Sequence, residues 1–319
     1  MVQKKRKIAI LGTGNVGATI AYTLTLQGIC SEIVLVDINK TKAEGEALDL
    51  TQCAASVPSV KIWSGEYKDV KGADIVIVTF GLARKPDQTR LDLAKVNVDI
   101  LKSVMPGVAK IAPKAIYIIV SNPVDVLTYV TMKCTGLPKN QIIGTGTLLD
   151  SNRLTQAVAS YCKVDVSNVN SFVLGEHGDA CMTPWSLCTI SGVPIKNYCK
   201  EILKVKNSKL SAELDNIYTG MVKSGSKVIK AKGATFYAIA ASAVQLVKAI
   251  LADTDTILPL STLLNGEYGA YDMCIGVPCM VGGSGFKKVV ELPLTKEEQQ
   301  LFAEKIASLD ATFQALGIR

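Results

Sequence analysis

A glycine-rich turn after the first apolar run constrains the fold of this chain more than any other feature. The apolar run at residues 8–11 is followed at once by the sequence Gly12-Thr13-Gly14-Asn15-Val16-Gly17. Apolar residues then recur at helical spacing, at Val16, Ile20 and Leu24, until Gly28 ends the pattern. The glycines therefore lie where a strand turns sharply into a helix, which is how a β-α-β unit begins.

Each glycine of this turn has a separate physical role. Gly12 permits the tight turn, Gly14 lets the backbone approach a pyrophosphate, and Gly17 allows the helix to pack closely on the strand. The N-terminus of the helix then faces the anion with its unpaired N–H groups. Asp37 follows about 20 residues later, where a carboxylate accepts hydrogen bonds from ribose hydroxyls and repels a 2′-phosphate. We therefore expect NAD as the cofactor, and not NADP.

Short β-branched runs alternate with helical patterns through the first half of the chain, which is typical of a parallel sheet. The expected strands lie at residues 8–11, 33–36, 74–79, 115–120 and 142–144. Their apolar residues are consecutive, because helices cover both faces of such a sheet. Longer helices follow, including an alanine-rich one expected at residues 235–251. We predict an α/β fold, with a doubly wound parallel sheet that binds the cofactor in residues 1–145 and an α+β substrate domain in residues 146–319.

The composition excludes several classes of function. The lysines behind the net charge of +7 are scattered along the chain, so nucleic acid is not an expected partner. No segment has the roughly 18 uncharged apolar residues of a membrane span, so no membrane association is expected. The nine cysteines include no Cys-x-x-Cys pair, which predicts neither a disulfide framework nor a metal site. Free thiols indicate a reducing compartment, and we expect a cytoplasmic protein.

The single histidine of the chain, His177, is the candidate acid/base. Oxidation of an alcohol by hydride transfer needs a group that exchanges the alcohol proton near neutral pH, and imidazole suits this role. Such a histidine needs a carboxylate that fixes its tautomer, and an anionic substrate needs a bidentate donor. Asp150 and Arg153 are spaced so that a helix would present both to one cleft.

Four motifs occur in the order and spacing of the lactate/malate dehydrogenase family, which the chain resembles over nearly its whole length. They are Gly-Thr-Gly-Asn-Val-Gly at residues 12–17, Ser-Asn-Pro at 121–123, Leu-Asp-Ser-Asn-Arg at 149–153 and Gly-Glu-His-Gly-Asp at 175–179. The resemblance implies a Rossmann fold, His177 as the catalytic acid/base, Asp150 as its orienting carboxylate and Arg153 as the ligand of the substrate carboxylate. Asn122 and Thr235 would contact the substrate. The cofactor contacts that the resemblance implies are Gly12, Gly14, Asn15, Val16, Gly17, Asp37, Thr79, Gly81, Val120 and Asn122.

The family also has a mobile lid, which would begin here at Gly81. Arg90 matches the family arginine that polarises the reacting carbonyl once the lid closes, and would be catalytic. Arg84 stands at the position where glutamine resembles the lactate enzymes and arginine the malate enzymes. A guanidinium can bind the second carboxylate of oxaloacetate, whereas an unpaired one beside the methyl group of pyruvate would cost several kcal/mol.

The rest of the chain resembles the lactate branch, at Glu176, at Thr235 and at residues 89–93 and 184–186. Asp87 could pair with Arg84 and cancel its charge. We therefore expect an NAD-dependent L-2-hydroxy-acid dehydrogenase, with pyruvate and L-lactate as the favoured substrates and oxaloacetate and L-malate as the alternative. A non-catalytic NAD-binding module is the alternative from another class, since a fold does not fix a function.

The resemblance also bears on assembly and regulation. It implies a homodimer or a homotetramer. Many bacterial lactate enzymes respond to fructose 1,6-bisphosphate through a histidine that precedes the catalytic one by seven residues, and Asn170 stands there in this chain. We therefore expect no activation by fructose 1,6-bisphosphate.

Overall fold

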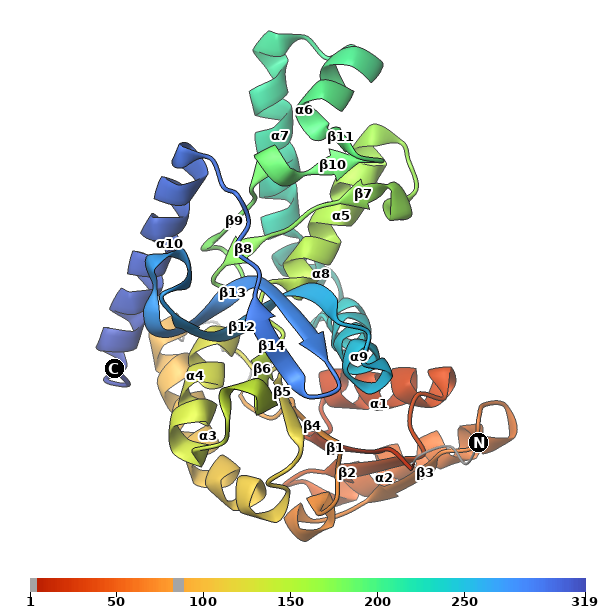
Figure 1. Ribbon diagram of the computed structural model, residues 1–319. Coiled ribbons are helices and arrows are strands. Elements are labelled where there is room, and N and C mark those ends of the chain that lie inside the picture. The colour runs from red at the N-terminus through yellow and green to blue at the C-terminus, as the bar shows by residue number, and fades with distance from the viewer. Residues whose placement is uncertain (1–4, 83–88) are drawn as a thin grey trace.

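The computed structural model describes residues 5–82 and 89–319, and for Arg90 the backbone alone. Within these residues the main sheet has 11 strands, and its first half is parallel, in the order β3-β2-β1-β4-β5-β6 (Figure 1). The bounds are Lys7–Leu11 (β1), Glu32–Val36 (β2), Lys61–Ser64 (β3), Ile75–Val78 (β4), Ile116–Ile119 (β5) and Ile142–Gly144 (β6). The strand order reverses between β1 and β4, which pair with each other. Open α/β sheets bind ligands at the carboxyl ends of the strands on either side of such a reversal.

Helices cover both faces of this parallel half (Figure 1). On one side lie α3 (Arg90–Ile111) and α4 (Val124–Thr135), and on the other lies α1 (Asn15–Gln27), with α9 (Tyr237–Ala252) packed against it. α2 (Lys40–Gln52) packs on β3. All residues of β4 and β5 are buried, which confirms the interpretation of consecutive apolar residues as strands covered on both faces.

The parallel sheet contains one strand, β3, that the sequence analysis did not predict. Its residues are Lys-Ile-Trp-Ser, and of these only Ile62 is buried. β3 lies at the edge of the sheet and pairs with β2 alone. An edge strand packs fewer side chains into the core, so its apolar pattern is too short to be recognised from the sequence.

The second half of the chain continues the same sheet with antiparallel strands. β12 (Thr256–Asn265) pairs with β6 through Ser261 and Gly144, and along its length with β13 (Tyr271–Gly282). The remaining strands of the main sheet are β8 (Leu174–Gly175), β9 (Cys181–Met182) and β14 (Gly285–Val289), and a small separate sheet contains β7 (Val169–Asn170), β10 (Thr189–Ile190) and β11 (Val193–Pro194). This antiparallel part with its helices confirms the α+β character predicted for the second half.

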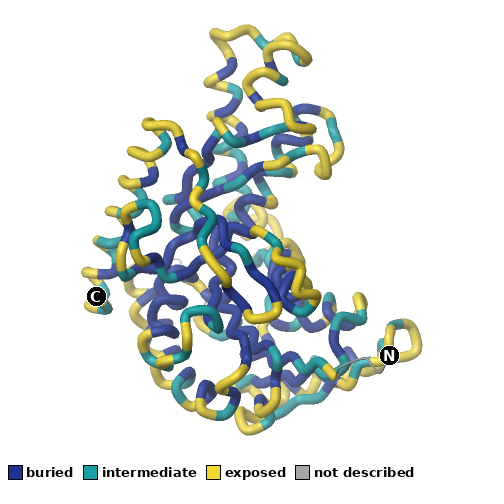
Figure 2. Tube along the Cα trace, viewed as in Figure 1, coloured by how far each residue is buried: buried dark blue, intermediate teal, exposed yellow. Residues whose placement is uncertain are grey.

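Two hydrophobic cores meet at α5 (Leu148–Cys162). The larger core surrounds the parallel strands, α9 and the β12–β13 hairpin, and appears as the dark blue centre of the trace in Figure 2. The smaller core lies between α5 and α7 (Asn207–Val222). Leu148 belongs to the larger core, and Leu154 belongs to the smaller one. The first turns of α5 therefore lie where the two cores adjoin.

Three further α-helices lie in the second half of the chain. They are α6 (Ile195–Asn197), α8 (Ser224–Lys232) and α10 (Lys296–Ala315). In Figure 1, α6 and α7 project from one end of the molecule, and α10 runs along its side to the C-terminus. In the described part of the chain, no helix combines the length and the hydropathy that a membrane crossing requires.

Candidate active site

His177 and Asp150 form a closely hydrogen-bonded pair. The Nδ1 atom of His177 lies 2.6 Å from Oδ2 of Asp150. The Asp150 side chain is 3% exposed and that of His177 is 21% exposed, so the carboxylate is enclosed while the ring remains accessible. With Nδ1 donating to the carboxylate, Nε2 is the ring nitrogen that can exchange a proton with a bound substrate.

The structure brings this pair together by attaching the segment before β8 to the start of α5. The Thr147 hydroxyl donates to the carbonyl oxygen of Val173 at 2.6 Å, and the N–H of Val173 donates to the Ser151 hydroxyl at 2.8 Å. Asp150 lies between them in the first turn of α5, where the helix dipole favours a negative charge. β8 then carries the chain directly to His177.

The pKa of His177 is raised above its ordinary value. Burial alone would lower the pKa of the imidazole, but the charge and the hydrogen bond of Asp150 outweigh that effect. Asp125 also raises this pKa, and the guanidinium of Arg153 opposes the increase. The protonated ring is therefore favoured, as a proton donor to a carbonyl oxygen requires.

Arg153 lies beside the pair on the next turn of the same helix. Its Nη1 atom is 3.4 Å from Oδ1 of Asp150, and its side chain is 17% exposed. Gly225 of α8 faces the guanidinium, since a Cβ atom added there would lie 3.4 Å from Nη2. Within the described residues, Arg153 makes one hydrogen bond, this long one to Asp150. A guanidinium carries five N–H donors, so its planar edge can still bind a carboxylate through two bonds.

The glycine turn has the geometry that a pyrophosphate site needs. Gly12 has a φ of 100°, and a Cβ atom added there would lie 2.7 Å from the backbone nitrogen of Phe80. A Cβ atom on Gly17 would lie 1.9 Å from the carbonyl oxygen of Gly12. Gly14 has no other atom within 4 Å of such a Cβ, and it caps α1 without a side-chain hydrogen bond. The open surface at Gly14 and the uncapped N–H groups of α1 suit a phosphate group.

Asp37 lies at the carboxyl end of β2, next to this turn. Its Oδ2 atom accepts hydrogen bonds from the backbone N–H of Thr13 at 2.6 Å and from the Thr13 hydroxyl at 3.0 Å. Its Oδ1 atom accepts one from the N–H of Asn39 at 2.9 Å. Burial tends to raise the pKa of Asp37, but these hydrogen bonds outweigh it and hold the pKa below its ordinary value. An ionised carboxylate beside a glycine turn fits NAD, because it can accept from ribose hydroxyls.

Two further predicted cofactor residues follow β4. The Thr79 hydroxyl donates to the carbonyl oxygen of Gly12 at 2.8 Å, so this side chain supports the glycine turn. Gly81 has a φ of 151°, and a Cβ atom added there would lie 3.3 Å from Oδ1 of Asn97. The other predicted cofactor residues lie on this same edge: Asn15 is exposed at the first position of α1, Val16 is half-buried and Val120 is buried just after β5.

Asn97 is a structural residue of this edge that the sequence analysis missed. Its side chain on α3 is 3% exposed. Its Oδ1 atom accepts from the N–H of Leu82 at 2.8 Å, and its Nδ2 atom donates to the carbonyl oxygen of Asn122 at 2.8 Å. One amide thus connects the loops that follow β4 and β5. The available sequence signal was a polar residue on an otherwise apolar helix face.

Asn122 and Thr235 lie on loops, and the structure gives neither side chain a hydrogen bond to the His177–Asp150 pair. Asn122 is exposed at the end of the loop after β5, with a cis peptide bond to Pro123. Thr235 is half-buried between α8 and α9. Asn152 attaches α5 to α9, since its Nδ2 atom donates to the Ser242 hydroxyl at 3.0 Å.

Arg84, Asp87 and the side chain of Arg90 lie outside the described residues. The backbone at Arg90 is described, and it begins α3. Thr89 caps this helix, since its hydroxyl accepts from the N–H of Asp92 at 3.1 Å while the N–H of Thr89 donates to the Asp92 carboxylate at 3.3 Å. This reciprocal capping box places the backbone of Arg90 at the first position of α3.

Asp125 is a second buried carboxylate beside His177, which the sequence analysis also missed. It is 1% exposed, and its Oδ2 atom accepts a hydrogen bond from the backbone N–H of His177 at 2.9 Å. Its Oδ1 atom accepts one from the Ser261 hydroxyl at 2.6 Å. The sequence signal was a lone acidic residue in the apolar start of α4.

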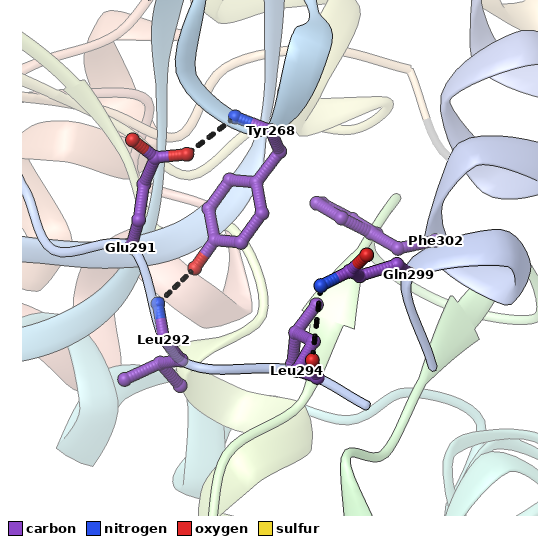
Figure 3. A pocket seen from close by; sticks show the side chains of 6 residues that line it. All are labelled: Tyr268, Glu291, Leu292, Leu294, Gln299 and Phe302. Carbon is purple, nitrogen blue, oxygen red and sulfur yellow. Dashed lines mark hydrogen bonds between the residues drawn. The ribbon is translucent and has the colours of Figure 1, made fainter. Parts of the chain in front are cut away.

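A separate cavity lies between the end of the β12–β13 hairpin and α10 (Figure 3). Its lining residues are Tyr268, Glu291, Leu292, Leu294, Gln299 and Phe302. The N–H of Leu292 donates to the Tyr268 hydroxyl at 2.8 Å, and the N–H of Tyr268 donates to the Glu291 carboxylate, also at 2.8 Å. Dashed lines mark both bonds in Figure 3. The cavity contains none of the predicted site residues, and we assign it no part in the reaction.

Comparisons with known proteins agree with this geometry. Residues 6–144 match the NAD-binding domain of lactate/malate dehydrogenase, and residues 147–316 match its alpha/beta C-terminal domain. An L-lactate dehydrogenase of Clostridium botulinum is 45% identical over 314 residues, which cover 98% of each chain. L-lactate dehydrogenase 1 of Clostridium acetobutylicum is 42% identical, over 99% of this chain and 100% of the relative. The ligand-bound crystal structure of the minor L-lactate dehydrogenase from Enterococcus mundtii has a TM-score of 0.92 and 39% identity, over 98% of both chains.

Proposed function

Because the chain belongs to the lactate/malate dehydrogenase family, we propose that it is an NAD-dependent L-lactate dehydrogenase, which interconverts pyruvate and L-lactate. The observation that carries this proposal is the 2.6 Å contact between His177 and the enclosed carboxylate of Asp150, with Arg153 beside it. A proton donor, its orienting carboxylate and a carboxylate-binding guanidinium are together the groups that reduction of a 2-oxo acid needs.

In the direction of reduction, Arg153 binds the substrate carboxylate and holds the reacting carbon in front of His177. NADH, when bound at the carboxyl edge of the parallel strands, would supply the hydride for that carbon. The Nε2–H of protonated His177 then donates its proton to the carbonyl oxygen, and Asp150 stabilises the imidazolium until that moment. In the reverse direction the neutral ring accepts the proton of the hydroxyl group. We assign to Arg90 the polarisation of the carbonyl, a contribution of roughly 3–4 kcal/mol for a positioned donor of this kind.

The cofactor would be held by the carboxyl edge of the parallel strands. We propose that Gly12, Gly14 and Gly17 shape the pyrophosphate site, with Asn15 and Val16 in the first turn of α1, and that Asp37 accepts from the adenine ribose. Thr79, Gly81, Val120 and Asn122 complete the edge toward the nicotinamide, and Asn122 and Thr235 also contact the substrate. The open backbone at Gly14 and the ionised Asp37 support this assignment.

Pyruvate, and not oxaloacetate, is the 2-oxo acid that we propose. The L-lactate dehydrogenases at 42% and 45% identity support this choice, whereas Arg84 resembles the malate enzymes. The test compares kcat/KM for the two acids with NADH, in wild type and in Arg84→Gln. We expect wild type to prefer pyruvate and the variant to increase that preference. A wild-type preference for oxaloacetate that Arg84→Gln reverses would show a malate enzyme instead.

Four further assignments accompany this function. We propose a division into a cofactor domain of residues 1–145 and a substrate domain of residues 146–319, a cytoplasmic location, and assembly as a homodimer or homotetramer. We also propose that fructose 1,6-bisphosphate does not activate the enzyme, because Asn170 in β7 carries no positive charge for a phosphate. Addition of the sugar bisphosphate should leave KM for pyruvate unchanged, and a large decrease in KM would contradict this.

A further inference from the structure

Asp125 is a carboxylate buried beside His177, although no step of the proposed reaction uses it. It lies in the first turn of α4, is 1% exposed, and has hydrogen bonds to two other elements. One comes from the backbone N–H of His177, at 2.9 Å, and the other from the Ser261 hydroxyl on β12, at 2.6 Å. Burial of a carboxylate is costly, so a chain retains one only where its hydrogen bonds or its charge compensate.

Ser261, whose hydroxyl donates to Asp125, lies in a row of paired residues that crosses the sheet. Ser261 pairs with Gly144 on β6 and with Gly276 on β13, and Gly276 pairs with Gly175 on β8. Three of the four residues in this row are glycines. A Cβ atom on Gly276 would lie 2.7 Å from the carbonyl oxygen of Gly175, and one on Gly144 would lie 2.8 Å from the Cβ of Ser261.

This row of residues connects both members of the catalytic pair. Gly144 lies shortly before α5, which carries Asp150, and Gly175 lies two residues before His177. Ser261 is the residue of the row that has a side chain, and its hydroxyl donates to Asp125. Asp125 therefore joins the loop that carries His177 to the middle of the sheet.

We propose that Asp125 is a positioning residue for His177, which holds the histidine loop against β12 and whose negative charge favours the protonated imidazole together with Asp150. This proposal rests on the proposed function where it concerns turnover. The effect of Asp125 on the protonation of His177, however, does not depend on the substrate. An Asp at this place does more than fill space, because the opposite charge of an imidazolium stabilises the anion in return.

The electrostatics agree with this geometry. Burial raises the pKa of Asp125, and the hydrogen bonds from Ser261 and from the backbone N–H of His177 and the charge of His177 act to lower it, with a net pKa of about 6. In the described part of the chain, Asp150 and Arg153 on α5 and Cys274 on β13 interact electrostatically with one or both of these residues. Asp150 raises the pKa of His177 more than Asp125 does, so we expect Asp125 to have the smaller effect of the two.

The decisive experiment uses the fact that the chain contains one histidine, so a ring label reports on one site. The full chain is labelled with ¹³C at histidine Cε1, and its NMR titration with pH is compared for wild type, Asp125→Asn and Ser261→Ala. Asp125→Asn keeps an oxygen that can accept from the N–H of His177 but removes the charge. We expect it to weaken the proton affinity of the imidazole roughly tenfold. Ser261→Ala destabilises the ionised carboxylate, and we expect a smaller change in the same direction.

Asp272→Asn is the matched control. Its carboxylate also contacts α4, through the hydroxyl of Tyr129 at 3.1 Å and the Nζ atom of Lys133 at 2.7 Å, but it makes no hydrogen bond to the His177 loop. In this variant His177 should titrate as it does in wild type. A wild-type titration in Asp125→Asn, or an equal change in Asp272→Asn, would overturn the proposal. If Asp125→Asn does not fold, Ser261→Ala decides, and an unchanged titration there would overturn it. Failure of the chain to reduce pyruvate would refute the proposed function but leave this titration interpretable.

Discussion

Replacement of Asp150 by asparagine tests the centre of the site. The variant retains the shape of the side chain and removes the charge that lies 2.6 Å from Nδ1 of His177. The Asp150 side chain is 3% exposed and the ring 21%, so water screens the pair only partly. Loss of one partner of a fully buried pair costs about 3–5 kcal/mol, and we expect a smaller cost of about 2–3 kcal/mol here because the ring is accessible to water. That corresponds to a decrease of roughly 30- to 150-fold in kcat for pyruvate reduction.

The pH profile provides the second half of this test. Reduction requires the imidazolium, so kcat/KM falls as the pH rises through the pKa of His177, which Asp150 raises. Without the charge and hydrogen bond of Asp150, the pKa of His177 should be lower than in wild type, so the decline should begin at a lower pH. The assay is the initial rate of NADH oxidation over a pH series, at saturating and at low pyruvate.

The control for this prediction is Asp165→Asn. Asp165 lies just beyond the other end of α5, where its exposed side chain accepts from Ser167, so its loss should leave both kcat and the pH profile unchanged. The reasoning is refuted if Asp150→Asn retains kcat within about threefold of wild type and keeps the wild-type pH profile.

Three further predictions address the cofactor edge and the stability of the fold. Gly17→Ala should lower the free energy of unfolding, measured in urea, by about 1–3 kcal/mol, because its Cβ would lie 1.9 Å from the carbonyl oxygen of Gly12. Gly14→Ala should unfold like wild type, because its Cβ would meet no other atom within 4 Å, and yet it should bind NADH more weakly in a fluorescence titration. Equal stability of the two variants would contradict the packing argument. Asp37→Asn should raise the ratio of kcat/KM for NADPH to that for NADH by roughly tenfold, since repulsion of the 2′-phosphate is lost; an unchanged ratio would refute the role of Asp37. The raised pKa of His177 means that its stabilising contribution is complete below the pKa of the unfolded chain and is lost as the pH rises through the folded pKa. The difference in unfolding free energy between wild type and His177→Gln should therefore shrink toward alkaline pH, and a difference that grows instead would show the sign to be wrong.

The sequence analysis predicted the parallel half of the sheet well because that half depends on local patterns. β1, the glycine turn and α1 follow one another within 21 residues, from Lys7 to Gln27, and each has its own composition. β3 was missed because an edge strand buries too few side chains to produce such a pattern. The side-chain contact of Asp150 with Arg153 was predictable in the same way, since the two residues share one face of α5.

Contacts between residues far apart in the chain could not be obtained in this way. Asn97 connects two loops, and Asp125 contacts the His177 loop 52 positions away and Ser261 136 positions away. A buried polar residue looks the same in a sequence whether it supports a loop or is simply tolerated, because its partners are defined only by packing.

The amino-acid sequence by itself determined the family and the glycine turn at the start of the parallel sheet, and it predicted the candidate acid/base histidine, because these depend on short motifs whose residues act within a turn or two of each other. Only the tertiary structure decided that Asp125 lies beside that histidine in addition to Asp150, and that the pKa of the histidine is raised despite burial. The reason is physical: the charge state of a buried group depends on desolvation and on neighbours within a few ångströms, and here those neighbours come from α4, α5 and β12, which the fold alone brings together.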